Sequence, residues 1–227
     1  MFYYDATYLI LIPALIISFW AQTKINSAFD RYSRISTMKG ITGAQVARML
    51  LDSDGLYDVP VELVGGRLSD HYDPKNRVMR LSHEVFYGNS VASIGVAAHE
   101  TGHAIQHKEK YAPLTLRNSI VPVVNIGSSF SWILFIGGMI LGLPSLVQFG
   151  IFLFSGVVVF QLITLPVEFN ASSRALRILD EKQILYNEEL KGARAVLNAA
   201  AMTYVAGAIM AVSQLLRLLI LSNRNRD

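Results

Sequence analysis

The stretch SIGVAAHETGH, residues 93–103, is the part of the sequence that says most about the fold and about the chemistry of a possible site. Its first six residues are apolar or small and predict a helix, which we expect to cover about 90–108. The last five fit the pattern His-Glu-x-x-His, in which His99 and His103 lie one helical turn apart on the same face. Two imidazoles in this arrangement can bind one zinc ion, and Glu100 beside them is placed to take a proton from water.

A surface helix with two solvated histidines is the alternative explanation of this pattern. Such a helix usually carries Lys and Glu over most of its surface. This stretch instead has Ile94, Val96 and Ala97 before the histidines, and Ala104 follows them. The apolar surroundings therefore favour a metal site over a solvated helix.

The composition is that of a membrane protein rather than of an ordinary soluble domain. Of the 227 residues, 52% are hydrophobic and 16% are charged, whereas soluble domains carry about 25% charged residues. There is no cysteine, so a metal ion must be bound by His and carboxylate groups. The formal charge of +3 is small and dispersed, so no nucleic-acid partner is expected.

Four apolar stretches come close to the roughly 20 residues that cross a bilayer. They cover residues 6–21, 120–141, 146–167 and 195–221. Pro13 lies inside the first stretch, and Arg217 interrupts the end of the last, which we interpret as a transmembrane or re-entrant helix. The expected fold class is therefore mainly α, a multi-pass helical membrane bundle with a small cytoplasmic α+β unit at 22–118.

Basic residues predict the orientation in the membrane. Segment 22–118 holds twelve Lys and Arg residues and segment 168–194 holds five, whereas the hinge 142–145 holds none. Because basic loops stay on the cytoplasmic side, we expect both long segments there and the N-terminus outside. No basic residue precedes the first stretch, so it is expected to be a retained anchor and not a cleaved signal peptide. Arg224 and Arg226 disagree with this orientation if all four stretches span the membrane.

The segment before the second apolar stretch contains signals for both helix and strand. Thr42 to Gln45 fits a capping box for a helix over 43–51, and residues 59–64 alternate as a strand does. A turn at 73–76 leads to a second strand at 77–81. If this second strand lies at a sheet edge beside the metal site, it can pair with an extended substrate. The alternative, a purely structural hairpin, is equally compatible with the sequence.

Zinc in hydrolases has three protein ligands, so His99 and His103 need a third. His107 lies on the same helix about 12 Å along the axis from His99, too far to share the ion. We therefore expect it at the rim of the site, in contact with a ligand residue, or in a structural role. The metzincin pattern places a glycine before its third histidine, but Gln106 occupies that position here.

A carboxylate is the remaining option for the third ligand. Glu168 follows the third apolar stretch on the side predicted to be cytoplasmic, where the motif helix is also expected. An ionisable group at a membrane boundary is a candidate functional residue. Glu84 and His83, just before the motif helix, are the reserve candidates.

These features together resemble a known family. The two central spans, the motif helix before the first and the stretch EFNASSRA at 168–175 after the second resemble the membrane gluzincins of the HtpX and CAAX-prenyl protease type. The chain is more similar still to the small bacterial zinc metallopeptidases of the YugP type. This resemblance covers nearly the whole chain, from residues 1–4 through the capped helix and 55–59 to 98–107 and 168–172. This resemblance implies one Zn2+ per chain on His99, His103 and Glu168, with Glu100 as general base, in the bacterial plasma membrane.

One position departs from the wider gluzincin pattern. Those proteins usually carry an Asp four residues after the ligand Glu, where it orients a zinc-bound histidine. Here Ser172 occupies that position, and a hydroxyl can accept the same hydrogen bond without supplying a charge. Asn170 and Arg174 are further candidates for contacts with a ligand or with the oxyanion of the reaction. For Arg174 we slightly favour the alternative of an anchor to lipid headgroups.

The sequence thus predicts a membrane-embedded zinc metalloendopeptidase that cleaves membrane proteins or membrane-proximal segments. Its expected partners are a peptide or membrane-protein substrate and the lipid bilayer. The alternative is a non-catalytic membrane scaffold with a structural zinc site, whose fourth position His71 or His83 would close. Transport is not expected, because the two central spans contain no charged residue.

Overall fold

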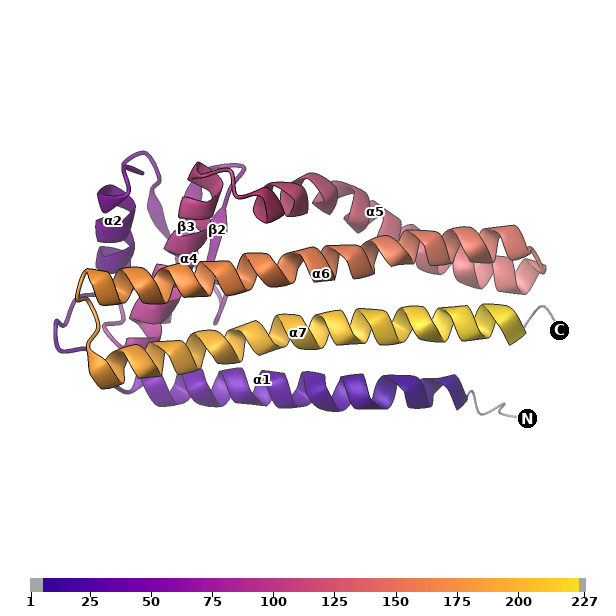
Figure 1. Cartoon of the computed structure of the whole chain (residues 1–227), viewed down its shortest axis with the longest axis horizontal. Coiled ribbons are helices and arrows are strands. Elements are labelled where there is room, and N and C mark those ends of the chain that lie inside the picture. Colours follow the sequence, from indigo (N-terminus) through magenta and orange to yellow (C-terminus); the bar gives the residue numbers. More distant parts are fainter. Residues whose placement is uncertain (1–5, 225–227) are drawn as a thin grey trace. The chain divides into compact units, whose positions relative to one another are not determined.

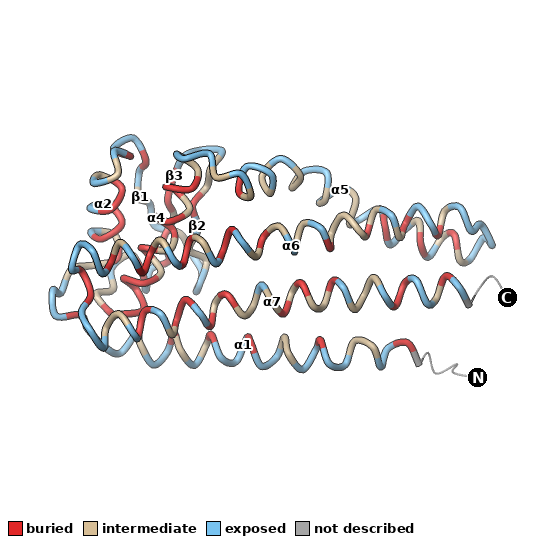
Figure 2. Tube along the Cα trace, in the orientation of Figure 1, coloured by how far each residue is buried: buried red, intermediate tan, exposed pale blue. Residues whose placement is uncertain are grey.

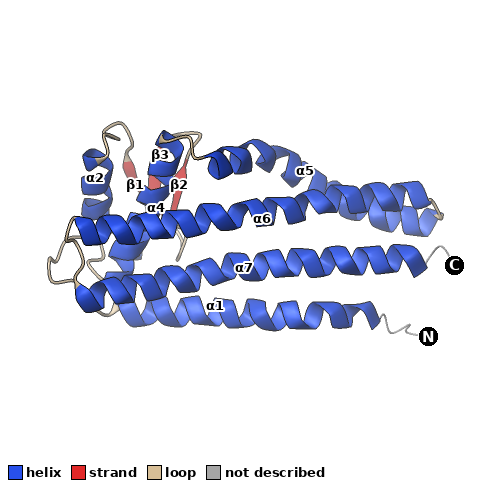
Figure 3. Ribbon diagram, viewed as in Figure 1, coloured by secondary structure: helices blue, strands red, loops and turns tan. Residues whose placement is uncertain are grey.

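A computed structural model describes residues 6–224, so residues 1–4 of the resemblance and Arg226 of the orientation argument lie outside the described residues. The chain is mainly helical with one small sheet, as expected (Figures 1 and 3). The elements in order are η1 (Ala6–Leu11), α1 (Ile12–Ser33), α2 (Gly43–Ser53), β1 (Val61–Val64), β2 (His71–Asp73), β3 (Val78–Ser82), α3 (His83–Phe86), α4 (Val91–Lys108), α5 (Ala112–Leu141), α6 (Pro144–Glu181) and α7 (Asn187–Arg224).

The described residues divide into two compact units. The helical unit consists of residues 6–22, 115–166 and 202–224. The mixed unit consists of residues 23–114 and 167–201, and it contains the whole sheet. Helices α1, α5, α6 and α7 contribute residues to both units.

Four helical segments are long and apolar enough to cross a membrane. They are Thr7–Ser33, Ala112–Leu141, Pro144–Glu181 and Asn187–Asn223. Large apolar side chains of the helical unit are exposed, among them Phe19 at 77% and Ile140 at 78%. Figure 2 shows exposed positions along each of its long helices. An apolar surface of this kind is suited to contact with lipid tails.

Close packing of α5 against α6 explains two of the glycines in the helical unit. A Cβ at Gly138 would lie 2.7 Å from the backbone N of Val147, and one at Gly150 would lie 2.7 Å from the carbonyl O of Ser131. A side chain at either position would push the helices apart. Gly137 and Gly156 make no such approach, because no atom outside the local helix lies within 4 Å of a Cβ there, and the nearest neighbour at Gly127 is 3.9 Å away.

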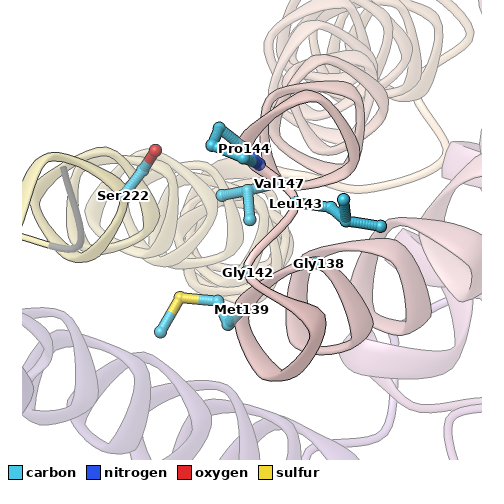
Figure 4. Close-up of a pocket in the computed structure, with 7 residues that line it drawn as sticks. All are labelled: Gly138, Met139, Gly142, Leu143, Pro144, Val147 and Ser222. Carbon is cyan, nitrogen blue, oxygen red and sulfur yellow. The ribbon is translucent and has the colours of Figure 1, made fainter.

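A small pocket lies beside the turn between α5 and α6 (Figure 4). It is lined by Gly138, Met139, Gly142, Leu143, Pro144, Val147 and Ser222. Gly142 has a φ of +64°, a conformation that favours glycine and that lets the chain reverse within a few residues. Apart from the Ser222 hydroxyl, no polar side chain lines this pocket, so it offers no group for chemistry.

The predicted capping box and helix in the mixed unit are confirmed. Thr42 Oγ1 accepts the backbone N–H of Gln45 at 3.3 Å, and Gln45 Oε1 accepts the N–H of Thr42 at 2.9 Å. Helix α2 follows directly and ends two residues later than expected. Val46, Leu50 and Leu51 on one side of α2 are buried in the core of the unit.

The sheet has the strand order β1-β3-β2, which corrects one expectation. Strand β3 covers most of the stretch 77–81 and is paired on both sides, parallel to β1 and antiparallel to β2. A strand paired on both sides has no free edge, so the stretch 77–81 cannot pair with a substrate. Strand β2, which pairs with β3 on the side opposite β1, is an edge strand. It is only three residues long, too short to show the alternation of polar and apolar residues that would predict a strand.

The motif helix α4 is buried on almost all sides (Figure 2). It begins after Ser90, whose hydroxyl accepts the N–H of Ser93 at 3.1 Å. Ile94, Ala97 and Ala98 have no exposed surface. The alternative of a solvated surface helix is therefore wrong.

Candidate metal centre

Gly102 sets how closely the motif helix approaches the mixed-unit part of α6. A Cβ at Gly102 would lie 2.7 Å from the carbonyl O of Ala171 and 3.2 Å from its Cα. Because both neighbours are backbone atoms, they cannot move aside as a flexible side chain can. A glycine between the two histidines thus allows contact with the turn of α6 that carries Glu168 and Ser172.

His99, His103 and Glu168 form the one group of potential metal ligands within the described residues. The Nε2 atoms of His99 and His103 lie 3.3 and 3.5 Å from Oε2 of Glu168. All three side chains are largely buried. The structure therefore brings together the three residues that the resemblance implies as zinc ligands.

The spacing of these atoms fits zinc. Two ligand atoms that each lie about 2.1 Å from zinc at a tetrahedral angle are about 3.4 Å apart. The measured separations of 3.3 and 3.5 Å agree with that value. Two imidazole nitrogens and one carboxylate oxygen are also a ligand set of zinc hydrolases, in which the fourth position is left for water.

Gln106 fixes which nitrogen of His103 faces the group. The amide nitrogen of Gln106 donates to the carbonyl O of Val167 and to Oδ1 of Asn170, both at 2.9 Å. The amide oxygen therefore faces Nδ1 of His103, 3.0 Å away, and must accept a proton from it. With the proton on Nδ1, the lone pair of Nε2 is available to a metal ion.

Ser172 has the corresponding position beside the other histidine. Its Oγ lies 3.1 Å from Nδ1 of His99, so the hydroxyl can accept the Nδ1–H and leave Nε2 available. This is the contact for which the sequence made Ser172 a candidate. A hydroxyl stabilises the positively polarised imidazole less than a carboxylate does, because it has no charge.

Asn170 and Arg174 continue the polar network away from the ligands. Oδ1 of Asn170 accepts from Nε of Arg174 at 2.7 Å, in addition to the amide of Gln106. The Arg174 guanidinium also pairs with Glu109 at 2.7 Å and lies over the ring of Tyr111. These contacts favour a role for Arg174 inside the protein over the headgroup anchor that the sequence slightly favoured.

Glu100 is buried next to the ligand group but does not belong to it. Its Oε2 accepts the backbone N–H of Tyr72 at 2.9 Å, so edge strand β2 holds the carboxylate in place. Burial raises the pKa of Glu100 to about 7, although neighbouring His99 lowers it. A carboxyl group with a pKa near neutrality can both accept and release a proton.

The other candidate residues lie outside the ligand group. Nδ1 of His107 lies 2.9 Å from the hydroxyl of Tyr72, in agreement with the expectation that it is too far along the helix to share the ion. Glu84 lies 3.6 Å from Arg67, and the ring of His83 packs against Tyr87. His71 contacts the carbonyl O of Ser69 at 2.8 Å. Within the described residues, neither His71 nor His83 closes a fourth position.

Two contacts that shape the site are absent from the sequence-based prediction. Gln106 enters that prediction only as the residue that rules out the metzincin pattern, although its spacing of three from His103 places it on the same helix face. Tyr72 holds Glu100 through its backbone, which no side-chain pattern reveals. The spacing of residues in the sequence could have predicted the contact between Gln106 and His103. It could not have predicted the contact between Tyr72 and Glu100.

Long apolar helices together with a buried His-His-Glu group and a second buried carboxylate define the class of membrane zinc metallopeptidases. Comparison with known proteins agrees: residues 7–223 match the family described as "Putative neutral zinc metallopeptidase", and the chain belongs to this family. A Bacillus subtilis (strain 168) protein described as "Putative membrane protease YugP" is 54% identical over 216 residues, which cover 95% of this chain and 96% of that protein. The resemblance to zinc metallopeptidases of the YugP type is thus confirmed. No solved structure matches the chain.

Proposed function

We propose that the chain is a membrane-embedded zinc endopeptidase that cleaves membrane proteins or membrane-proximal segments. The observation that carries the proposal is the group formed by Nε2 of His99, Nε2 of His103 and Oε2 of Glu168, with separations that fit one zinc ion. Glu100 lies buried beside this group. The family and the protease relative support the peptidase activity.

The mechanism assigns a role to each polar group. His99, His103 and Glu168 would hold the metal, and Ser172 and Gln106 keep the two imidazoles in the required tautomer. Zinc supplies a Lewis acid for the peptide carbonyl and lowers the pKa of water in the site.

Glu100 is the proposed general base. Its Oε2 is engaged by the Tyr72 N–H, so Oε1 is the atom that accepts the proton of the attacking water. The water oxygen bonds to the carbonyl carbon of the peptide, and as the C–N bond breaks, Oε1 delivers that proton to the leaving amine nitrogen. The separate hydrogen bond on Oε2 keeps the carboxylate oriented through both steps.

Strand β2 is the proposed guide for the substrate backbone. It is one of the two edge strands of the sheet, and the backbone N–H of Tyr72 in it contacts Glu100 directly. An extended substrate beside this strand would have its backbone next to the reacting carboxylate. This assignment replaces the stretch 77–81, which lies in the middle of the sheet.

We further propose an arrangement in the bacterial cell membrane with the active site on the cytoplasmic side. The twelve basic residues of segment 22–118 and the five of segment 168–194 support this orientation. The four long apolar helices support several membrane crossings. A substrate emerging from the bilayer on that side would then reach the site before it is fully solvated.

Zinc content and peptide cleavage, measured in parallel on purified wild type, Glu168→Ala and Glu100→Gln, test the proposal. We expect Glu168→Ala to lose zinc and activity, because one of three ligands is removed. Glu100→Gln should keep zinc and lose cleavage of a fluorogenic peptide. Zinc bound as tightly by Glu168→Ala as by wild type would exclude Glu168 as a ligand, and cleavage retained by Glu100→Gln would exclude the base. Stoichiometric zinc without any cleavage by wild type would favour a non-catalytic scaffold.

A further inference from the structure

The helical unit has a cavity of about 570 Å3 that is open to the surface and to which α1, α5, α6 and α7 all contribute. Five polar side chains line it: Ser18, Gln22, Gln161, Thr203 and Gln214. They come from α1, α6 and α7, so polar groups of three candidate membrane-spanning helices face one space. Polar side chains in such helices usually mark a functional position.

The glutamines are the informative members of this set. The amide of Gln161 lies against α7, since a Cβ at Gly207 would be 3.4 Å from Gln161 Oε1. Nε2 of Gln214 is buried and has no hydrogen-bond partner among the described residues. A buried amide nitrogen without a partner is destabilising, and turning this side chain so that the nitrogen meets an acceptor in the cavity would remove that cost.

The remaining wall is apolar. The rings of Trp132 and Phe154 lie edge to face with their centroids 6.3 Å apart, and Met210 also lines the space. No charged residue lines the cavity. The phosphate of a lipid headgroup or a free ion would therefore find no opposite charge, and the lining fits a neutral ligand with both apolar and hydrogen-bonding parts.

A peptide group is such a ligand. It has one donor and one acceptor, and the amide of a glutamine side chain can pair with both. A membrane-spanning helix satisfies its own backbone groups, so only a stretch that has left the helical conformation offers free N–H and C=O groups inside the bilayer. We propose that this cavity binds a non-helical stretch of a membrane-spanning substrate segment. The proposal rests on the proposed function and names a feature of its substrates.

The chain allows a direct test, because Trp132 is one of only two tryptophans. Trp20→Phe leaves Trp132 as the sole indole. Zinc-loaded Trp20→Phe protein in nanodiscs of zwitterionic lipid is titrated with a synthetic polyleucine transmembrane peptide that has a central Gly-Pro-Gly break and a nitroxide beside it. A matched peptide has leucines in place of the break. We expect saturable quenching of Trp132 by the broken peptide and much weaker quenching by the unbroken one.

Substitutions of the amides link the binding to the cavity. In the same background, Gln161→Leu combined with Gln214→Leu should weaken binding of the broken peptide about tenfold, as expected for the loss of one or two hydrogen bonds. Gln148→Leu changes the same type of side chain in α6 outside the cavity lining and should leave binding unchanged. Circular dichroism and zinc content verify folding, and Gln214→Leu alone serves if the double variant does not fold.

Equal quenching by both peptides, or binding that the cavity substitutions leave unchanged, would overturn the inference. Cleavage of a soluble fluorogenic peptide is measured on the same preparations. Cleavage without selective quenching would contradict only the inference. Selective quenching without any cleavage would support the cavity and contradict only the peptidase proposal.

Discussion

Oε1 of Gln106 lies 3.0 Å from Nδ1 of His103, and this contact decides which imidazole nitrogen faces the ligand group. The amide cannot rotate by half a turn without cost, because its nitrogen donates to the carbonyl O of Val167 and to Asn170. The orientation of His103 is thus fixed by the backbone of α6, the same helix that carries Glu168. The Gln106 side chain therefore links the position of His103 on α4 to the backbone of α6, which carries Glu168.

Gln106→Leu should weaken zinc binding while the ligands themselves stay in place. Without the acceptor, His103 loses both its preferred tautomer and its ring orientation, and such losses cost about 10–100-fold in metal affinity. Competition with a chromogenic chelator measures the affinity in detergent. Gln148→Leu is the matched control and should bind zinc as wild type does. An unchanged affinity of Gln106→Leu would show that the contact does not orient His103.

Substitutions of Ser172 should change zinc affinity in opposite directions. Ser172→Ala removes the acceptor for Nδ1 of His99 and should weaken binding, on the order of tenfold. Ser172→Asp supplies a carboxylate to the same proton and should slow zinc dissociation. Stopped-flow transfer of zinc to a chelator measures both variants. The same direction of change in both would contradict the assigned hydrogen bond.

Gly102→Ala should separate the motif helix from α6. The new Cβ would lie 2.7 Å from the carbonyl O of Ala171, so backbone must shift, at a cost of about 1–3 kcal/mol. We expect a lower midpoint of thermal unfolding in the metal-free protein and weaker zinc binding. Gly137→Ala is the control, because no atom outside the local helix lies within 4 Å of its Cβ, and it should be neutral or stabilising by up to about 1 kcal/mol. Equal effects of the two substitutions would exclude the close approach as their cause.

The sequence predicts the structural features that depend on neighbouring residues better than those that depend on contacts between distant residues. The cap at Thr42, the start of the motif helix after Ser90 and the long apolar helices depend on neighbouring residues, and the sequence predicts them. The edge strand β2 depends on pairing with β3, and three residues are too few for a periodic signal. The sequence therefore offered the stretch 77–81 as the candidate edge strand, with a structural role as the alternative, whereas this stretch lies in the middle of the sheet.

The candidate site shows the same division. The spacing of His99 and His103 is a property of one helix, whereas Glu168 lies 65 residues after His103 and reaches the group through the close approach at Gly102. Residue type and membrane position made Glu168 a candidate, and the resemblance implied its role. No pattern within either helix specifies the distance between them, because that distance depends on the backbone contact with Ala171.

The stability of the metal-free protein should depend on pH through Glu100. Burial raises the pKa of this carboxyl from 4.5 to about 7, so between these values the folded state holds a proton that the unfolded chain has released. The contribution to the free energy of unfolding is therefore fully present below about pH 4.5 and is lost as the pH rises through about 7. Thermal unfolding of metal-free wild type from pH 4.5 to 8 should show this decline. Glu100→Gln cannot ionise and should show a flatter profile, so equal slopes in the two proteins would assign the pH dependence to other groups.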